Sequence, residues 1–173
     1  VPVRIWRDGQ VMDITLPVFV YEKDRSAGNQ FDVLPRYYVY GGLVFTPLSL
    51  DYIKALGGNW ADTSNREIVY ELFHRPHEDQ KTTRPEPIAL AAVLAGAVNA
   101  NVKTQGRLIV DKINNVRIER LEDVIRAFET STNMHDVIEF SPNGNFETLN
   151  RLEVSKENAS LLKTYGITKD RRL

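Results

Sequence analysis

The sequence predicts an α+β fold built from short antiparallel strands and a smaller number of helices. Short stretches in which apolar and polar residues alternate recur along the chain, and most end at residues typical of turns, such as glycine, asparagine or proline. Other stretches place apolar residues at helical spacing behind a residue that can cap a helix. With 173 residues, of which 42% are hydrophobic, the chain is long enough for one domain with a buried core, or for one domain with an extension.

The composition argues against several classes of function. The 22 basic and 23 acidic side chains give a net charge of −1, which is not the basic balance expected of a chain that binds nucleic acid or an anionic membrane. The chain contains no cysteine, so disulfides and thiolate chemistry are ruled out. The longest apolar run, residues 88–98, is too short to cross a bilayer. We expect no cofactor.

The first part of the chain is predicted to be a β-hairpin that is separate from the main domain. Two alternating stretches flank Asp8-Gly9, which is a strong short-range signal for a hairpin. A polar segment that contains serine, glycine and asparagine follows and is typical of a linker. We therefore divide the chain into a terminal hairpin at residues 1–21, a linker at residues 22–36 and a main domain at residues 37–173.

Two adjacent glycines, Gly41 and Gly42, separate the alternating stretch 37–40 from the apolar stretch 43–45. Adjacent glycines adopt positive φ easily, so the plain interpretation is a tight turn between two strands. They also leave backbone N–H groups unshielded, and several such groups that point one way can hold a carboxylate. A strand that leaves such a nest with one free edge could accept a peptide as an added strand. The local sequence leaves both interpretations open.

Four segments are expected to be helical. The capping candidates for three of them are Ser49, Ser64 and Ser155. The remaining helix, residues 121–128, begins near acidic residues that suit the positive end of a helix dipole.

The segments between the helices are predicted from their turn residues. Residues 107–113 form a strand that ends at a turn, Asn114-Asn115, because asparagine tolerates positive φ. Residues 88–94 fit either a buried strand or the start of a short helix. Residues 74–87 contain three prolines and many charges, and we expect a surface loop there.

The order of these elements resembles a known family. Residues 109–118 look like the PDZ segment that reads I-x-x-I-N-G-x-x-V, and residues 122–128 resemble the helix that follows it. The chain departs from the pattern at Asn115, where most PDZ domains have glycine. Asparagine adopts the same left-handed conformation at modest cost, so the departure does not change the expected fold.

Further segments narrow the resemblance. Residues 42–48, together with Tyr52, are similar to the G-L-V-F-x-P-L…Y start of the last PDZ-like domain in Do-like (Deg/HtrA) serine proteases. The tail, residues 162–173, is similar to the end of that domain, and residues 4–9 resemble the hairpin that ends the preceding PDZ domain. The linker and residues 74–87 have no counterpart in the family pattern.

The resemblance implies a bent antiparallel sheet or barrel with two main helices and an extra C-terminal helix. It also implies a peptide groove between the strand that follows the glycines and the helix at residues 121–128. The residues that would line the peptide and carboxylate site are Gly41, Gly42, Leu43, Val44, Phe45, Leu121 and Ile125. In this register Val124 and Phe128 would face the core. The lining residues could equally belong to an ordinary core, and apolar residues at helical spacing more often do.

The residues argue against catalysis by this chain. The resembling family places its catalytic serine in a G-N-S-G-G motif, and that motif does not occur here. His74 and His77 have a spacing that would suit a metal only on a helix, and Pro76 lies between them. We therefore expect no catalytic residue and no metal site.

The function implied by the resemblance is a non-catalytic protein- or peptide-binding and assembly module of a Deg/HtrA-type, trypsin-like serine endopeptidase. The expected partner is a peptide or the PDZ domain of a neighbouring subunit, within a homo-oligomer of the full-length protein. The alternative is a structural PDZ-like domain with an occluded groove that mediates oligomerisation alone. A periplasmic or organellar location is favoured by the resemblance only.

Overall fold

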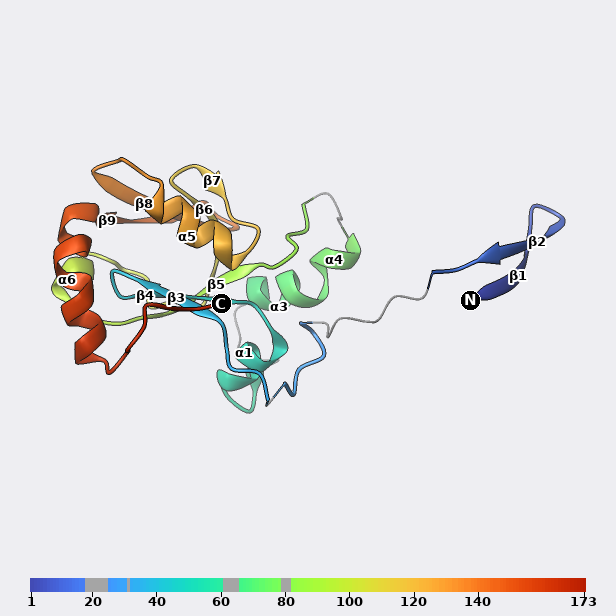
Figure 1. Cartoon of the computed structure of the whole chain (residues 1–173), viewed down its shortest axis with the longest axis horizontal. Helices are drawn as coiled ribbons and strands as arrows, with labels where there is room; N and C mark the ends of the chain where they lie inside the picture. The colour runs from blue at the N-terminus through green and yellow to red at the C-terminus, as the bar shows by residue number, and fades with distance from the viewer. Residues whose placement is uncertain (18–24, 31, 61–65, 79–81) are drawn as a thin grey trace.

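The computed structural model describes residues 1–17, 25–30, 32–60, 66–78 and 82–173. Its described residues form two separate sheets, and helices flank the larger one (Figure 1), which confirms the predicted α+β fold. The smaller sheet is the predicted hairpin, in which β1 (Pro2–Arg7) pairs with β2 (Gln10–Thr15). The predicted cap at Ser64 lies outside the described residues.

The larger sheet is antiparallel and runs in the order β10-β3-β4-β5-β6-β8-β9, with β7 paired to β6. This order places the last described strand beside the first strand of the main domain. The strands are β3 (Tyr37–Tyr40), β4 (Leu43–Pro47), β5 (Ile88–Val93), β6 (Leu108–Ile113), β7 (Val116–Arg117), β8 (His135–Ser141), β9 (Phe146–Asn150) and β10 (Arg171–Arg172).

The described helices are α1 (Leu50–Ala55), α3 (Arg66–Phe73), α4 (Arg75–Glu78), α5 (Leu121–Glu129) and α6 (Arg151–Thr164), with a short helical turn, η1 (Ala97–Asn99). Ser49 caps α1 as predicted, because its Oγ accepts the amide hydrogen of Tyr52 at 3.2 Å. The predicted cap of the last helix is wrong. Asn150 caps α6 by accepting the amide hydrogen of Leu152 at 3.0 Å, while Ser155 lies inside the helix.

The sheet separates two hydrophobic cores, because neighbouring residues of a strand point to opposite faces. Leu90 and Val110 belong to the larger core, which includes residues of α5 and α6. Ala89 and Ile109 belong to a smaller core with residues of α1 and α3. The ambiguous segment is therefore a strand at residues 88–93, which is buried on both faces at residues 88–90.

The predicted turn between β6 and β7 is confirmed. Asn114 and Asn115 both have positive φ, 51° and 65°. The side chain of Asn114 also donates to the carbonyl of Ala127 at 3.1 Å and accepts the amide hydrogen of Val137 at 3.0 Å. The turn thereby connects α5 to β8.

The expectation of a surface loop at residues 74–87 is wrong at residues 75–78, which form α4, and at Arg84, which is buried. Its guanidinium donates to the carbonyl of Ile118 at 3.1 Å and forms ion pairs with Glu71 and Asp111. These acceptors satisfy the buried charge, which would otherwise be costly. Local sequence cannot predict these contacts, because the acceptors come from α3, β6 and the segment before α5.

Candidate protein-interaction site

The two glycines form the tight turn of a hairpin. Gly41 and Gly42 have φ of +55° and +83°, and the flanking residues Tyr40 and Leu43 are paired across the turn. Positive φ at both central residues is the geometry that fits the twist of a two-residue hairpin. The tight turn, one of the two interpretations that the sequence left open, is therefore confirmed.

The turn is packed too tightly to admit a side chain. A Cβ on Gly41 would lie 2.8 Å from a methyl carbon of Leu149 and 3.0 Å from one of Val154. A Cβ on Gly42 would overlap the side chain of Asn99 and the carbonyl of Leu94. Both positions therefore require glycine for space as well as for conformation.

The predicted carboxylate nest has an acceptor from the protein itself. The amide of Gly41 donates to Oδ1 of Asn158, in α6, at 3.0 Å. The carbonyl of Gly41 accepts from Nδ2 of Asn99 at 2.8 Å. Side-chain amides from two other elements therefore already bind the Gly41 peptide groups.

β4 has no free edge of the kind that an added peptide strand would need. Phe45 is opposite Tyr38 of β3 on one side and opposite Leu90 of β5 on the other. Because both edges of β4 carry a partner strand, a peptide cannot add to it unless one neighbour leaves.

The predicted wall residues come together, but they do so inside the core. Leu43, Phe45 and Leu121 are fully buried, Ile125 is 7% exposed, and Val44 is half-buried. All of them except Val44 belong to the larger core, together with the predicted core residues Val124 and Phe128. Leu43, Phe45, Leu121 and Ile125 therefore do not line an open surface.

The side chains of β3 fill the space beside α5. The ring of Tyr40 stacks on that of Phe128 with centroids 4.1 Å apart, and the ring of Tyr38 lies 6.2 Å from the same phenylalanine. Tyr38 is 3% exposed. These two aromatic residues therefore pack against Phe128, on the side of α5 that was predicted to face the core.

A buried carboxylate fixes the position of Tyr40. Asp136, fully buried in β8, accepts hydrogen bonds from the Tyr40 hydroxyl at 2.6 Å, from Asn114 Nδ2 at 2.7 Å and from Arg151 Nη1 at 2.8 Å. Burial, followed by the hydrogen bond to Asp136, raises the pKa of the Tyr40 phenol above its ordinary value. The hydroxyl therefore stays protonated and can donate to the carboxylate.

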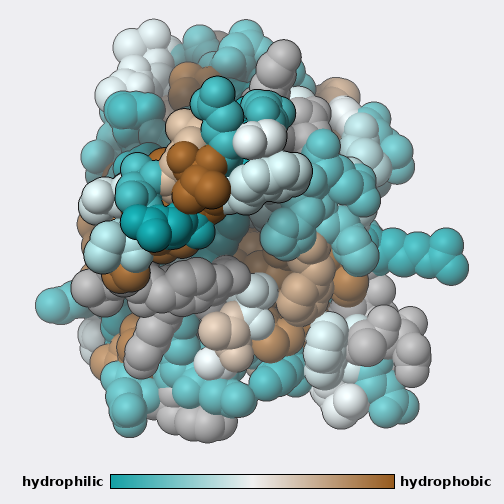
Figure 2. All heavy atoms as spheres, turned by 90° about the vertical axis from the view of Figure 1, so that its right-hand side faces the viewer, coloured by the Kyte–Doolittle hydropathy of each residue, from teal (hydrophilic) through white to brown (hydrophobic). Residues whose placement is uncertain are grey.

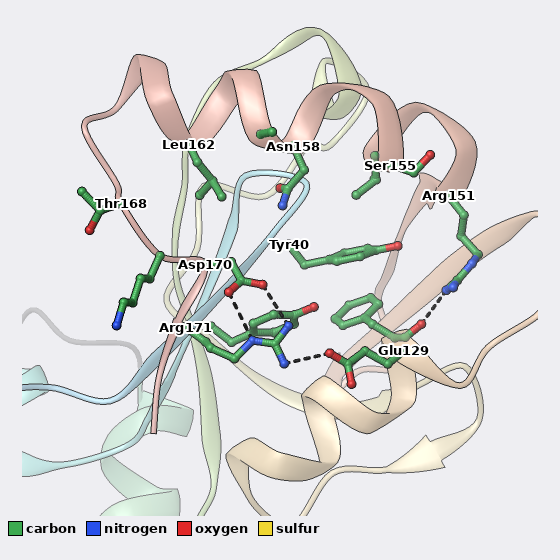
Figure 3. A pocket seen from close by; sticks show the side chains of 14 residues that line it. Tyr40, Glu129, Arg151, Ser155, Asn158, Leu162, Thr168, Asp170 and Arg171 are labelled. Carbon is green, nitrogen blue, oxygen red and sulfur yellow. Dashed lines mark hydrogen bonds and ion pairs between the residues drawn. The ribbon is translucent and has the colours of Figure 1, made fainter.

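A cleft of about 700 Å³ lies next to β3, between α6 and the last described residues (Figure 3). Its lining includes Tyr38 and Tyr40, the end of α5 at Glu129, and Asp170 and Arg171 near the C-terminal end. The sequence did not predict this cleft, because its walls are far apart in the chain. Its one local signal was the alternation of tyrosines at residues 37–40.

Elsewhere on the surface, hydrophobic residues are interspersed with hydrophilic ones on the face drawn in Figure 2. Among the residues that the structure describes, no group of three histidine, aspartate or glutamate side chains is placed to hold a metal ion. In the same residues, no helix combines the length and the apolar character needed to cross a membrane.

Comparisons with known proteins indicate the family of this chain. A sequence profile described as PDZ domain matches residues 27–172. A protein of Arabidopsis thaliana named "Protease Do-like 4, mitochondrial" is 32% identical over 103 residues, which cover 60% of this chain. The matched region spans 16% of that protein's length, so most of the relative has no counterpart here.

Proposed function

Because the chain belongs to the PDZ domain family, we propose that it is a protein-interaction module whose own strand β3 occupies the position of a bound peptide strand. PDZ domains bind extended peptides by adding them to the edge of a sheet. In this chain β4 is the strand predicted to offer that edge, and β3 pairs with it antiparallel. The occluded groove is thus favoured over an open one.

The observation that carries the proposal is the pairing of β4 on both edges, together with the stacking of Tyr40 on Phe128. An added strand contributes main-chain hydrogen bonds and places alternate side chains in pockets. β3 supplies both kinds of contact, because Tyr38 and Tyr40, two residues apart, point toward α5. A tethered strand also has an effective concentration on the order of millimolar or more, which disfavours a free competitor.

The wider role that we propose is assembly within a larger protein of the Do-like protease kind. In that role this part of the chain would contribute protein contacts and no catalytic residue. The relative's name supports this role. Because β3 fills the proposed groove, partners would bind to other surfaces of the domain.

The hairpin at residues 1–16 provides one such surface. Cross-strand partners lie on the same face of a sheet, and the register joins Val3 to Ile14 and Ile5 to Met12. One face is therefore apolar along most of its length, and polar only at Arg7 and Gln10 beside the turn. Its apolar residues are Val1, Val3, Ile5, Met12, Ile14 and Leu16. Val1, Met12 and Leu16 are between 44% and 61% exposed, and a two-stranded hairpin is marginal on its own in water. We propose that this face packs on another protein surface, in accord with a boundary after residue 21.

The test is a titration of the wild-type protein with short extended peptides, one of which is a copy of residues 36–40. Binding is measured from the chemical shifts of the protein's amide groups by NMR. We expect no saturable shift along β4 or α5 at about 1 mM peptide, because the tethered strand competes. Saturable shifts of the amides at residues 43–47 and 121–129 would show an open groove and overturn the proposal.

A further inference from the structure

We propose that residues 167–172 form a latch that holds β3 in the groove, so that releasing this segment opens the groove to an external strand. The inference rests on the proposed closed groove and concerns its regulation. The segment comes from the opposite end of the main domain, and it reaches β3 along the edge that faces away from β4.

The backbone of the latch makes a short pairing with β3. Arg171 and Arg172 are opposite Tyr38 and Tyr37, and the amide of Val39 donates to the carbonyl of Asp170 at 2.7 Å. The hydroxyl of Tyr37 donates to the carbonyl of Lys169 at 3.0 Å. Each of these contacts ends on β3, so the segment is positioned to restrain that strand.

The side chain of Arg171 contacts one wall of the closed groove and the strand that fills it. Its guanidinium donates to Oε1 of Glu129, at the end of α5, at 2.7 Å (Figure 3). It also lies 5.0 Å from the ring centre of Tyr38. Asp170 pairs with the same guanidinium at 2.9 Å and orients it. One side chain therefore links the latch to α5 and to β3.

The latch is built from weaker contacts than the strand that it covers. The side chains of Arg171 and Glu129 are 33% and 53% exposed, whereas Tyr38 is 3% exposed. Ion pairs that water and salt can reach are weak, and a pairing of two residues has few hydrogen bonds to lose. The cleft beside β3 gives the segment an open side. The segment can therefore detach while the cores stay intact, and β3 then loses one of its two edges.

The test is hydrogen exchange of the β3 amides in the wild type and in Arg171→Ala. Since the Val39 amide faces β10, the amides of Tyr38 and Tyr40 face β4 and report the β3–β4 pairing. Removing the ion pair and the contact with the Tyr38 ring should raise their exchange rates about tenfold. Arg126→Ala is the matched control, because it removes a different ion pair, with Asp123, from α5, the helix that carries Glu129. In this variant the β3 amides should exchange at the wild-type rate.

A double-variant cycle with Glu129→Gln locates the effect. If the ion pair between Arg171 and Glu129 acts as a latch, the Tyr40 amide should exchange little faster in the double variant than in Arg171→Ala alone. The peptide copy of residues 36–40 should also bind Arg171→Ala more tightly than the wild type. Its affinity should rise by the same factor as the fraction of molecules with an open groove.

The outcomes separate the latch from the closed groove. Unchanged exchange at Tyr38 and Tyr40 in Arg171→Ala overturns the latch and leaves the groove closed. Equal acceleration of every amide, including those of β6, also overturns it, because the segment would then belong to the global core. Fast exchange at Tyr38 and Tyr40 in the wild type itself refutes the closed groove, whatever the variants do.

Discussion

The ring of Tyr40 stacks on the ring of Phe128 with 4.1 Å between centroids and 20° between planes. The two residues belong to the first strand of the main domain and to the helix that was predicted to border a peptide groove. Their contact ties β3 to α5, and the Tyr40 hydroxyl extends it to the buried carboxylate of Asp136 at 2.6 Å.

Truncating Tyr40 should destabilise the domain strongly. Tyr40→Ala removes the stacked ring and one of the donors to Asp136, so we expect a loss of about 3 kcal/mol in the free energy of unfolding. Tyr40→Phe keeps the ring and removes the donor alone, and should cost about 1–2 kcal/mol. Urea unfolding measures both. Equal effects of the two variants would mean that the ring contact contributes nothing.

Alkaline pH should weaken the fold through Tyr40. Its pKa is raised in the folded state, first by burial and then by the hydrogen bond to Asp136, so the unfolded chain loses its phenolic proton first. The contribution is complete below the ordinary tyrosine pKa of about 10 and is lost as pH rises from there through the folded-state pKa. Stability measured from pH 9 to 11 should fall less steeply in Tyr40→Phe. An identical slope in both proteins would exclude this linkage.

The glycine turn should tolerate no side chain. Gly42→Ala forces alanine into positive φ and into overlap with Asn99 and Leu94, so we expect a loss of about 3 kcal/mol or more. Gly144→Ala is the control, because that residue has φ of +66° with nothing within 4 Å of an added Cβ. It should lose about 1 kcal/mol, from backbone strain alone. Thermal unfolding compares them, and similar losses would show that the turn has room.

Ile125 tests the orientation of α5. The resemblance places this side chain at a groove, where a charge would be tolerated, whereas the structure leaves it 7% exposed in the core. Ile125→Glu should therefore cost about 3 kcal/mol or more, because it buries an unpaired charge. Ile125→Val should cost about 1 kcal/mol. A folded Ile125→Glu protein with near-normal stability would mean that the side chain faces an open groove.

The elements with local signals were predictable, and the contacts between distant elements were not. The hairpin at Asp8-Gly9, the Ser49 cap and the Asn114-Asn115 turn each depend on a few adjacent residues with specific backbone or hydrogen-bonding preferences. The glycine pair was ambiguous, because a turn and an anion nest both need positive φ. What decided it was the packing of α6 and η1 around the turn, which no local pattern encodes.

The state of the groove depended on long-range pairing. The side chains of Leu43, Phe45 and Leu121 are apolar whether they line a groove or a core, so the sequence could not separate the two. Arg84 shows the same limit for a charged residue, since its burial depends on Glu71 and Asp111. Arg171 contacts Tyr38, near the opposite end of the domain, and Glu129, 42 residues away in the chain, so no local pattern predicts its position.

The most direct test of the closed groove is the nuclear Overhauser effect between the ring protons of Tyr40 and Phe128 in the unliganded wild-type protein. A closed groove predicts strong cross-peaks between these rings, since their centroids are 4.1 Å apart. It also predicts that the cross-peaks persist when peptide is added. Absence of these cross-peaks, together with peptide-induced shifts along β4 and α5, would contradict it.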